Sequence, residues 1–220
     1  MTDILDEILN DDKDAKRLQI FRKTLPIIII FTIITAIIIA GYTWFSQAKT
    51  QHNQEIGDSF VQLVSGEYTD EKLVTSLLEE ITINSETKLS ELASIKLVST
   101  QVQLNDIPKA MQALETIIDN KEYSEITTSY ARISYISLIL DISDLSTDQE
   151  NKSREYLQYF NKDSQVFYAT ATLLKSLFYL KINQFDFAKE HALEVLKLPK
   201  ASGVIKEQAK AVLAHISIKT

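Results

Sequence analysis

The amino-acid sequence predicts an all-α protein with one N-terminal transmembrane helix followed by a domain of stacked helices. Three observations support this prediction. Residues 25–45 carry no charge, apolar residues recur at helical spacing through residues 46–220, and the 220 residues include only four Gly and three Pro. Scarce turn-forming residues argue against β-hairpins and Gly-rich loops. We therefore expect a leader at 1–24, a membrane helix at 25–45 and a helical-repeat domain at 46–220.

The leader is short and strongly charged. Its first ten residues carry an apolar stripe that suits either a docking helix or a segment that folds only transiently, since so short a helix is marginal alone. Basic side chains cluster directly before the apolar run, whereas only Lys49 follows within twenty residues. Positively charged flanks stay in the cytosol, so we expect the leader to be cytosolic and residues 46–220 to be translocated. The residues that set this topology are Lys13, Lys16, Arg17, Arg22 and Lys23.

The apolar run begins at Leu25 and Pro26 and ends at Trp44 and Phe45. A helix of this length spans roughly 30 Å, the thickness of the hydrocarbon core of a bilayer. A cleaved signal peptide is the main alternative, but its cleavage site requires a small residue where Ile38 stands. A buried core helix or a strand would also be apolar, although strands are rarely this long. The sequence favours a permanent anchor.

Nine amphipathic stripes follow, and the helices that they predict form about four pairs with a last helix as a C-terminal cap. The segment 104–110 aligns with 182–188 at an offset of 78 residues, which places Ala110 on Ala188. Small residues at these positions, and at Ala192, allow a second helix to pack closely on the first. The unit at 123–161 is the least regular. The stripes lie at 56–64, 73–81, 89–97, 107–118, 126–137, 156–160, 166–177, 185–195 and 205–216.

Residues 169–199 resemble a tetratricopeptide repeat, with Tyr179, Ala188, Ala192 and Val195 at the packing positions of its pattern. Ser176 departs from that pattern, which has Gly or Ala there. With its charged leader and single span, the whole chain resembles the bacterial YfgM-like family. That resemblance implies an inner-membrane protein with a periplasmic domain. It also implies partners: the Sec translocon, a membrane-anchored prolyl isomerase (PpiD) and emerging client proteins.

The chain offers little chemistry for catalysis. It has no Cys, and His52, His191 and His215 show no ligand spacing with one another. Apart from the adjacent Glu190, we also expect no carboxylate at ligand spacing with His191. The adjacent carboxylates Glu79 and Glu80 point about 100° apart on a helix, which suits a solvated face. No phosphate-binding loop or nucleophile elbow is present. A net charge of −7 disfavours nucleic acid. We expect a protein that is not an enzyme, without a cofactor or a metal ion.

Nine aromatic residues gather between residues 156 and 187. Either they form the core between the last helix pairs, or some of them line a groove that grips apolar side chains of a client. The candidates for a groove are Tyr156, Tyr159, Tyr168 and Tyr179. Two functions remain open: a membrane-tethered interaction module with a chaperone-like role at the translocon, or a structural scaffold subunit of another envelope complex with one permanent partner.

Overall fold

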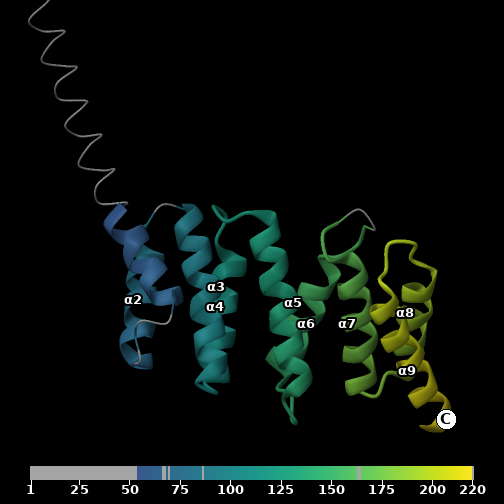
Figure 1. Ribbon diagram of the computed structural model, residues 1–220. Coiled ribbons are helices and arrows are strands. Elements are labelled where there is room, and N and C mark those ends of the chain that lie inside the picture. Colours follow the sequence, from purple (N-terminus) through teal and green to yellow (C-terminus); the bar gives the residue numbers. More distant parts are fainter. Residues whose placement is uncertain (1–53, 66–67, 69, 86, 163–164, 220) are drawn as a thin grey trace, which may run out of the picture. The chain divides into compact units, whose positions relative to one another are not determined.

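The computed structural model describes residues 54–65, 68, 70–85, 87–162 and 165–219, and all secondary structure in this part of the chain is helical (Figure 1). This confirms the all-α prediction for the described residues. A helix at 54–65 precedes eight further helices. Their bounds are α2 Glu71–Asn84, α3 Thr87–Gln103, α4 Ile107–Asp119, α5 Glu125–Asp141, α6 Thr147–Gln158, α7 Tyr168–Lys181, α8 Phe185–Lys197 and α9 Gly203–Lys219.

The proposed anchor and its flanks lie outside the described residues. This holds for the span 25–45, with Leu25, Pro26, Trp44 and Phe45 at its ends, and for the basic cluster before it. None of the helices within the described ranges is both long and apolar enough to cross a membrane. The membrane helix therefore stays a prediction from sequence.

Polar side chains fix where several helices begin. Asp70, Asp106, Ser124 and Ser146 each precede a helix, and each side chain accepts a hydrogen bond from a backbone N–H of the first turn. At α6 the amide side chain of Gln149 also accepts from the backbone N–H of Ser146, which completes a capping box. The capping box starts α6 at Thr147, well before the apolar stripe at 156–160, so this helix is longer than the stripe predicts.

The two turns that the sequence aligned have the same backbone structure. Asn105 and Asn183 both adopt the left-handed conformation, with φ of 57° and 59°. The following backbone N–H bonds back across the turn in each case, from Asp106 to Gln101 and from Gln184 to Tyr179. This pattern is the Schellman ending of a helix, for which Asn is suited because it tolerates positive φ. Ala110 and Ala188, which share the same offset, are both fully buried.

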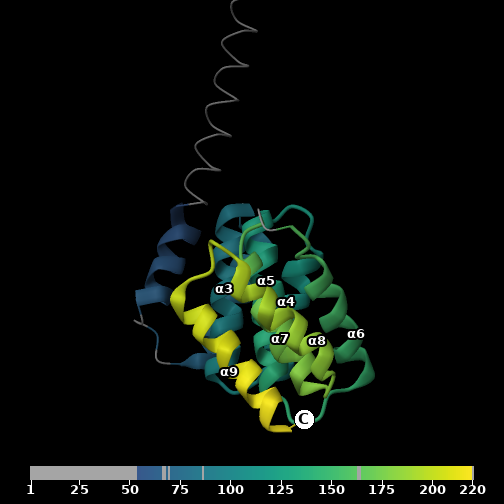
Figure 2. The same cartoon turned by 90° about the vertical axis from the view of Figure 1, so that its right-hand side faces the viewer.

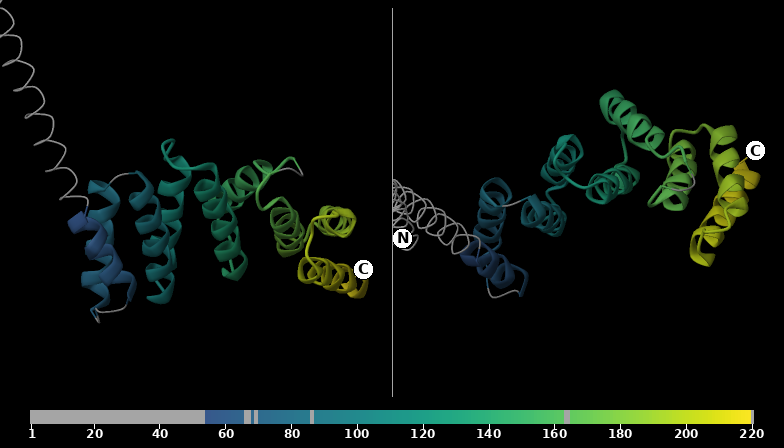
Figure 3. Two further views of the ribbon diagram at one scale, coloured as in Figure 1. Left: turned by 45° about the horizontal axis from the view of Figure 1, so that its top comes forward. Right: turned by 90° about the horizontal axis from the view of Figure 1, so that it is seen from above.

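The chain divides into two units, Met1–Glu55 and Ile56–Thr220. Within the second unit each helix from α2 onward packs on the next one in the sequence, which produces a row (Figure 3). Figure 2 looks along this row with α9 in front. Helix α7 also contacts both α5 and α9 directly, so α5, α7 and α9 follow one another in one layer while α6 and α8 connect them. Stacked helices of this kind bury a core between neighbours.

The core face of α5 differs from the stripe that the sequence predicts. Ile126 and Tyr130 of that stripe are 60% and 41% exposed, whereas Thr127, Ala131 and Tyr135 are buried. The small side chains allow α5 to approach α4 closely, and this geometry outweighs the larger apolar area of the expected stripe. The prediction for this face was wrong.

Helix α3 shows the same effect. Leu92, which the predicted stripe includes, is 54% exposed, while Ser90, Ala93 and Ser94 are buried. The hydroxyl of Ser90 donates to the backbone carbonyl of Thr82 at 2.6 Å, and that of Ser94 donates to the carbonyl of Ser90. Small hydroxyl residues can thus occupy a helix contact because their polar atoms find partners there.

Candidate functional site

Of the four tyrosines that the sequence placed in a groove, Tyr156 belongs to the core. It is only 7% exposed, and its ring packs edge-on against that of Tyr135 with the centroids 5.0 Å apart. It is one of the buried residues of the core cluster that extends from α3 to α7. Its ring is therefore not free to grip a client, so of the two alternatives that the sequence left open the core applies to this residue.

Tyr159, the residue after α6, is half-buried and meets two charged residues of α5. Its hydroxyl donates to a carboxylate oxygen of Glu125 at 3.0 Å. The guanidinium carbon of Arg132 lies 4.1 Å from the centroid of its ring, which is a cation–π contact. The Tyr159 side chain thereby contacts a carboxylate and a guanidinium that both come from α5.

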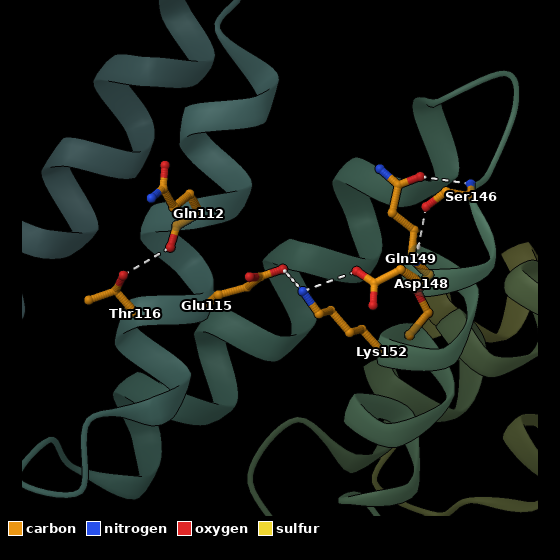
Figure 4. A network of polar contacts seen from close by, with 8 residues as sticks. Gln112, Glu115, Thr116, Ser146, Asp148, Gln149 and Lys152 are labelled. Carbon is orange, nitrogen blue, oxygen red and sulfur yellow. Dashed lines mark hydrogen bonds and ion pairs between the residues drawn. The ribbon is translucent and has the colours of Figure 1, made fainter.

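Arg132 and Tyr159 line a cavity of about 570 Å³ between α4, α5 and α6. One charged contact extends from α4 to α6 beside it: the ammonium of Lys152 lies 3.0 Å from a carboxylate oxygen of Glu115 and 3.2 Å from one of Asp148 (Figure 4). The other hydrogen bonds drawn in Figure 4 are local: Thr116 bonds to Gln112 on α4, and Ser146 bonds to Gln149 at the start of α6. The lining residues are Glu115, Ile118, Asp119, Arg132, Lys152, Glu155, Tyr156, Gln158 and Tyr159.

Burial and neighbouring charges shift the pKa values of three side chains at or near this cavity. Burial and the nearby Glu115 carboxylate raise the pKa of Tyr156 to about 12, and the same two causes raise that of Tyr135. Hydrogen bonds to Glu115 and Asp148 raise the pKa of Lys152. The tyrosines therefore remain neutral and the lysine charged at neutral pH, so none of these three groups is poised as a general base.

Tyr168 and Tyr179 lie elsewhere, where α7 packs on α8. The Tyr168 hydroxyl donates to Glu194 at 2.6 Å, and Nδ1 of His191 lies 3.1 Å from the other oxygen of the same carboxylate. The ring of Tyr179 stacks on the imidazole of His191 and also packs against Phe187. Tyr168 in addition lines a second cavity, of about 330 Å³, at the start of α7. The four tyrosines are close in the sequence but lie in three parts of the structure: Tyr156 in the core, Tyr159 at the cavity beside α6, and the other two where α7 packs on α8.

The contact between His191 and Glu194 was missed at the sequence level, where His191 was expected to have no carboxylate at ligand spacing. The two residues are three positions apart on α8, which places both side chains on the same face of the helix. His215 is exposed. In the part of the chain that the structure describes, no group of three or more acidic or imidazole side chains could hold a metal ion.

The second surface of interest is the apolar face of α5, which we define as Ile126, Tyr130 and Ile133. The first two are exposed large apolar side chains, and Ile133 beside them is half-buried. Arg132 and Tyr130 are two positions apart, which on a helix means roughly 200° around the axis. Ile133 is adjacent to Arg132 and lies roughly 100° from it, so the apolar face points in a different direction from the polar cavity without lying opposite to it. Sequence periodicity found these residues but assigned them to the core.

Comparison with known proteins places the chain in a family. Residues 1–216 match the model of a family described as "Protein of unknown function (DUF2659)". The chain is also 35% identical to "Uncharacterized protein RP231" of Rickettsia prowazekii (strain Madrid E), over 219 residues that cover 99% of this chain and 100% of that protein. No solved structure matches the chain. Because the family model extends over nearly the full length, the chain belongs to the DUF2659 family.

Proposed function

We propose that this chain is a membrane-tethered protein-interaction module, not an enzyme, and that it holds apolar segments of other polypeptides against the apolar face of α5. The observation that carries the proposal is the exposure of Ile126 and Tyr130 on a helix whose core residues, such as Tyr135 and Ile136, are buried on another face. Grouped apolar side chains on a surface are typical of interaction sites. The cavity chemistry supports the same view, since the raised pKa values of Tyr156 and Lys152 leave neither side chain as a general base at neutral pH.

The architecture that we propose is a tetratricopeptide-like stack. Its pairs are 56–65 with α2, α3 with α4, α5 with α6 and α7 with α8, and α9 caps the end. Support comes from the identical turns at Asn105 and Asn183 and from the direct contacts of α5 with α7 and of α7 with α9. Such stacks present extended surfaces to peptides.

The location that we propose is the bacterial inner membrane, with the leader in the cytosol and the helical domain in the periplasm. The apolar run at 25–45 and the basic cluster before it support this arrangement. The resemblance to the YfgM-like family supports a role beside the Sec translocon, with a PpiD-like prolyl isomerase and emerging proteins as partners. Tethering raises the local concentration of a weak binder where its clients emerge.

Photo-crosslinking in intact membranes tests this function. A photoreactive amino acid at Tyr130 is expected to crosslink to several substoichiometric client proteins and to a translocon component. The matched control carries the same amino acid at Gln112, an exposed residue of α4 outside the apolar face of α5. Equal crosslinking from both positions would contradict the proposal. One stoichiometric partner at Tyr130 would instead indicate a scaffold subunit.

A further inference from the structure

Among the described residues, the Arg132 guanidinium contacts an aromatic ring but leaves one of its donors unpaired. Its Nη1 atom is buried and has no hydrogen-bond partner among the described residues, although the guanidinium rests on the ring of Tyr159. Buried donors in folded proteins are almost always paired, and leaving a charged one unpaired costs about 1–3 kcal/mol or more. Arg132 is one of the residues that line the polar cavity between α4, α5 and α6.

The neighbouring charges explain why Arg132 stays unpaired. Glu115 is occupied by Lys152, and Glu125 accepts from the hydroxyl of Tyr159. Asp119 and Glu155 line the same cavity and are exposed to solvent. The cavity therefore offers the guanidinium of Arg132 to an anion, and the carboxylates of Asp119 and Glu155 to a cation.

We propose that this cavity binds a peptide carboxylate through Arg132, with an adjacent cationic group of the same peptide beside Asp119 and Glu155. A planar guanidinium matches a carboxylate with two parallel hydrogen bonds. The volume of about 570 Å³ exceeds what a single small ion fills, and Ile118 supplies an apolar wall for the rest of a residue. The two acidic groups disfavour phosphate-rich ligands and nucleic acid.

The carboxylate can be an acidic side chain or the free C-terminus of the partner, and three peptides distinguish these sources. The first has blocked ends and adjacent Glu and Lys residues, and the second ends in Lys with a free carboxylate and no acidic side chain. The third is the blocked peptide with Gln in place of Glu. Titration calorimetry with the full chain in nanodiscs is expected to show saturable binding of the first or the second peptide and none of the third.

Two substitutions at Arg132 then test the anchor. Arg132→Met is expected to weaken binding by at least about tenfold, because the hydrogen bonds to a charged group are lost. Arg132→Lys keeps the charge but loses the planar pair of donors, so its affinity for the peptide should lie between those of the unmodified chain and of Arg132→Met. Circular dichroism checks that each variant remains helical.

A labelling experiment keeps the proposal testable even if the Arg132 variants unfold. The chain has no Cys, so Gln158→Cys, at an exposed position of the cavity lining, can be labelled alone with a bulky maleimide. Labelling should abolish peptide binding, whereas labelling of Ser137→Cys, which is exposed on α5, should leave it unchanged.

Binding of neither carboxylate peptide with a Kd below about 1 mM would overturn the proposal, as would equal binding by the labelled Gln158→Cys protein. This inference extends the proposed interaction function to a second surface. Since none of the residues of the apolar face lines the cavity, crosslinking at Tyr130 and peptide binding at Arg132 can fail independently.

Discussion

At the scale of single residues, the contact between α7 and α8 depends on a small hydroxyl side chain. Ser176 is fully buried, and its Oγ donates to the backbone carbonyl of Ala188 at 2.7 Å. We expect Ser176→Ala to lower the free energy of unfolding by roughly 1 kcal/mol through loss of this bond. Ser176→Val should cost roughly 1–3 kcal/mol more, because the added methyl groups have no space.

Urea denaturation of the full chain in detergent, followed by far-UV circular dichroism, measures both values. The Ser176→Ala variant serves as the control for the lost hydrogen bond. A Ser176→Val protein as stable as the unmodified chain would contradict the close approach of α7 and α8.

The carboxylate of Glu194 makes stability depend on pH. Burial alone would raise the pKa of Glu194, but hydrogen bonds from Tyr168 and His191 outweigh it and lower this pKa below its ordinary value of 4.5. A carboxylate with a lowered pKa in the folded state stabilises the protein above its unfolded pKa. That stabilisation is lost as the pH falls through the folded-state pKa. Acidification below about 4.5 should therefore weaken the α7–α8 contact.

Tyr168→Phe tests this dependence. We expect the variant to lose roughly 1 kcal/mol at pH 7, and the difference from the unmodified chain to shrink as the pH falls below 4.5. Tyr130→Phe is the matched control, since this side chain is exposed, and it should be neutral throughout. Urea denaturation across pH 3–7 provides the measurement. A constant difference between Tyr168→Phe and the unmodified chain at every pH would argue against the role of Glu194.

At the scale of helices, α5 offers a comparison of the same residue type on two faces. Ile136 is fully buried in the core, whereas Ile126 is 60% exposed. Ile136→Ala should cost about 2–5 kcal/mol because it leaves a cavity, and Ile126→Ala should change stability by less than about 0.5 kcal/mol. Urea denaturation of both variants is the test. Similar losses of unfolding free energy for the two variants would indicate that Ile126 is buried, as hydrophobic periodicity predicts.

Helix positions were largely predictable because their signals are local. Capping residues such as Asp106 and Ser124 precede apolar stripes, and the repeated turns carry Asn at positions that need positive φ. The orientation of α5 was not predictable, since Thr127 and Ala131 are buried at the helix contact while larger apolar residues stay outside. Periodicity ranks side chains by hydrophobicity, but close helix packing selects them by size.

The candidate cavity could not be predicted from the sequence either, because it depends on contacts between helices. Glu115 and Lys152 are separated by 37 residues, and no local spacing connects them. The aromatic cluster indicated the correct region, because Tyr159 and Tyr156 both line the cavity. It could not indicate that the polar partner would be Arg132 from the preceding helix, which follows only from the packing of α5 on α6.

For the whole molecule, we propose that a single span holds the helical interaction domain on the far side of the membrane. Because the chain has no Cys, one introduced residue reports its own compartment. Ser137→Cys probes the helical domain, and Lys13→Cys probes the leader. The measurement is reaction with a membrane-impermeant maleimide in cells whose outer membrane alone is permeabilised.

We expect Ser137→Cys to react in these cells and Lys13→Cys to react only after the inner membrane is also opened. This is the result that the basic cluster before the span predicts. Reaction of Lys13→Cys together with protection of Ser137→Cys would contradict the account, because the interaction domain would then lie in the cytosol.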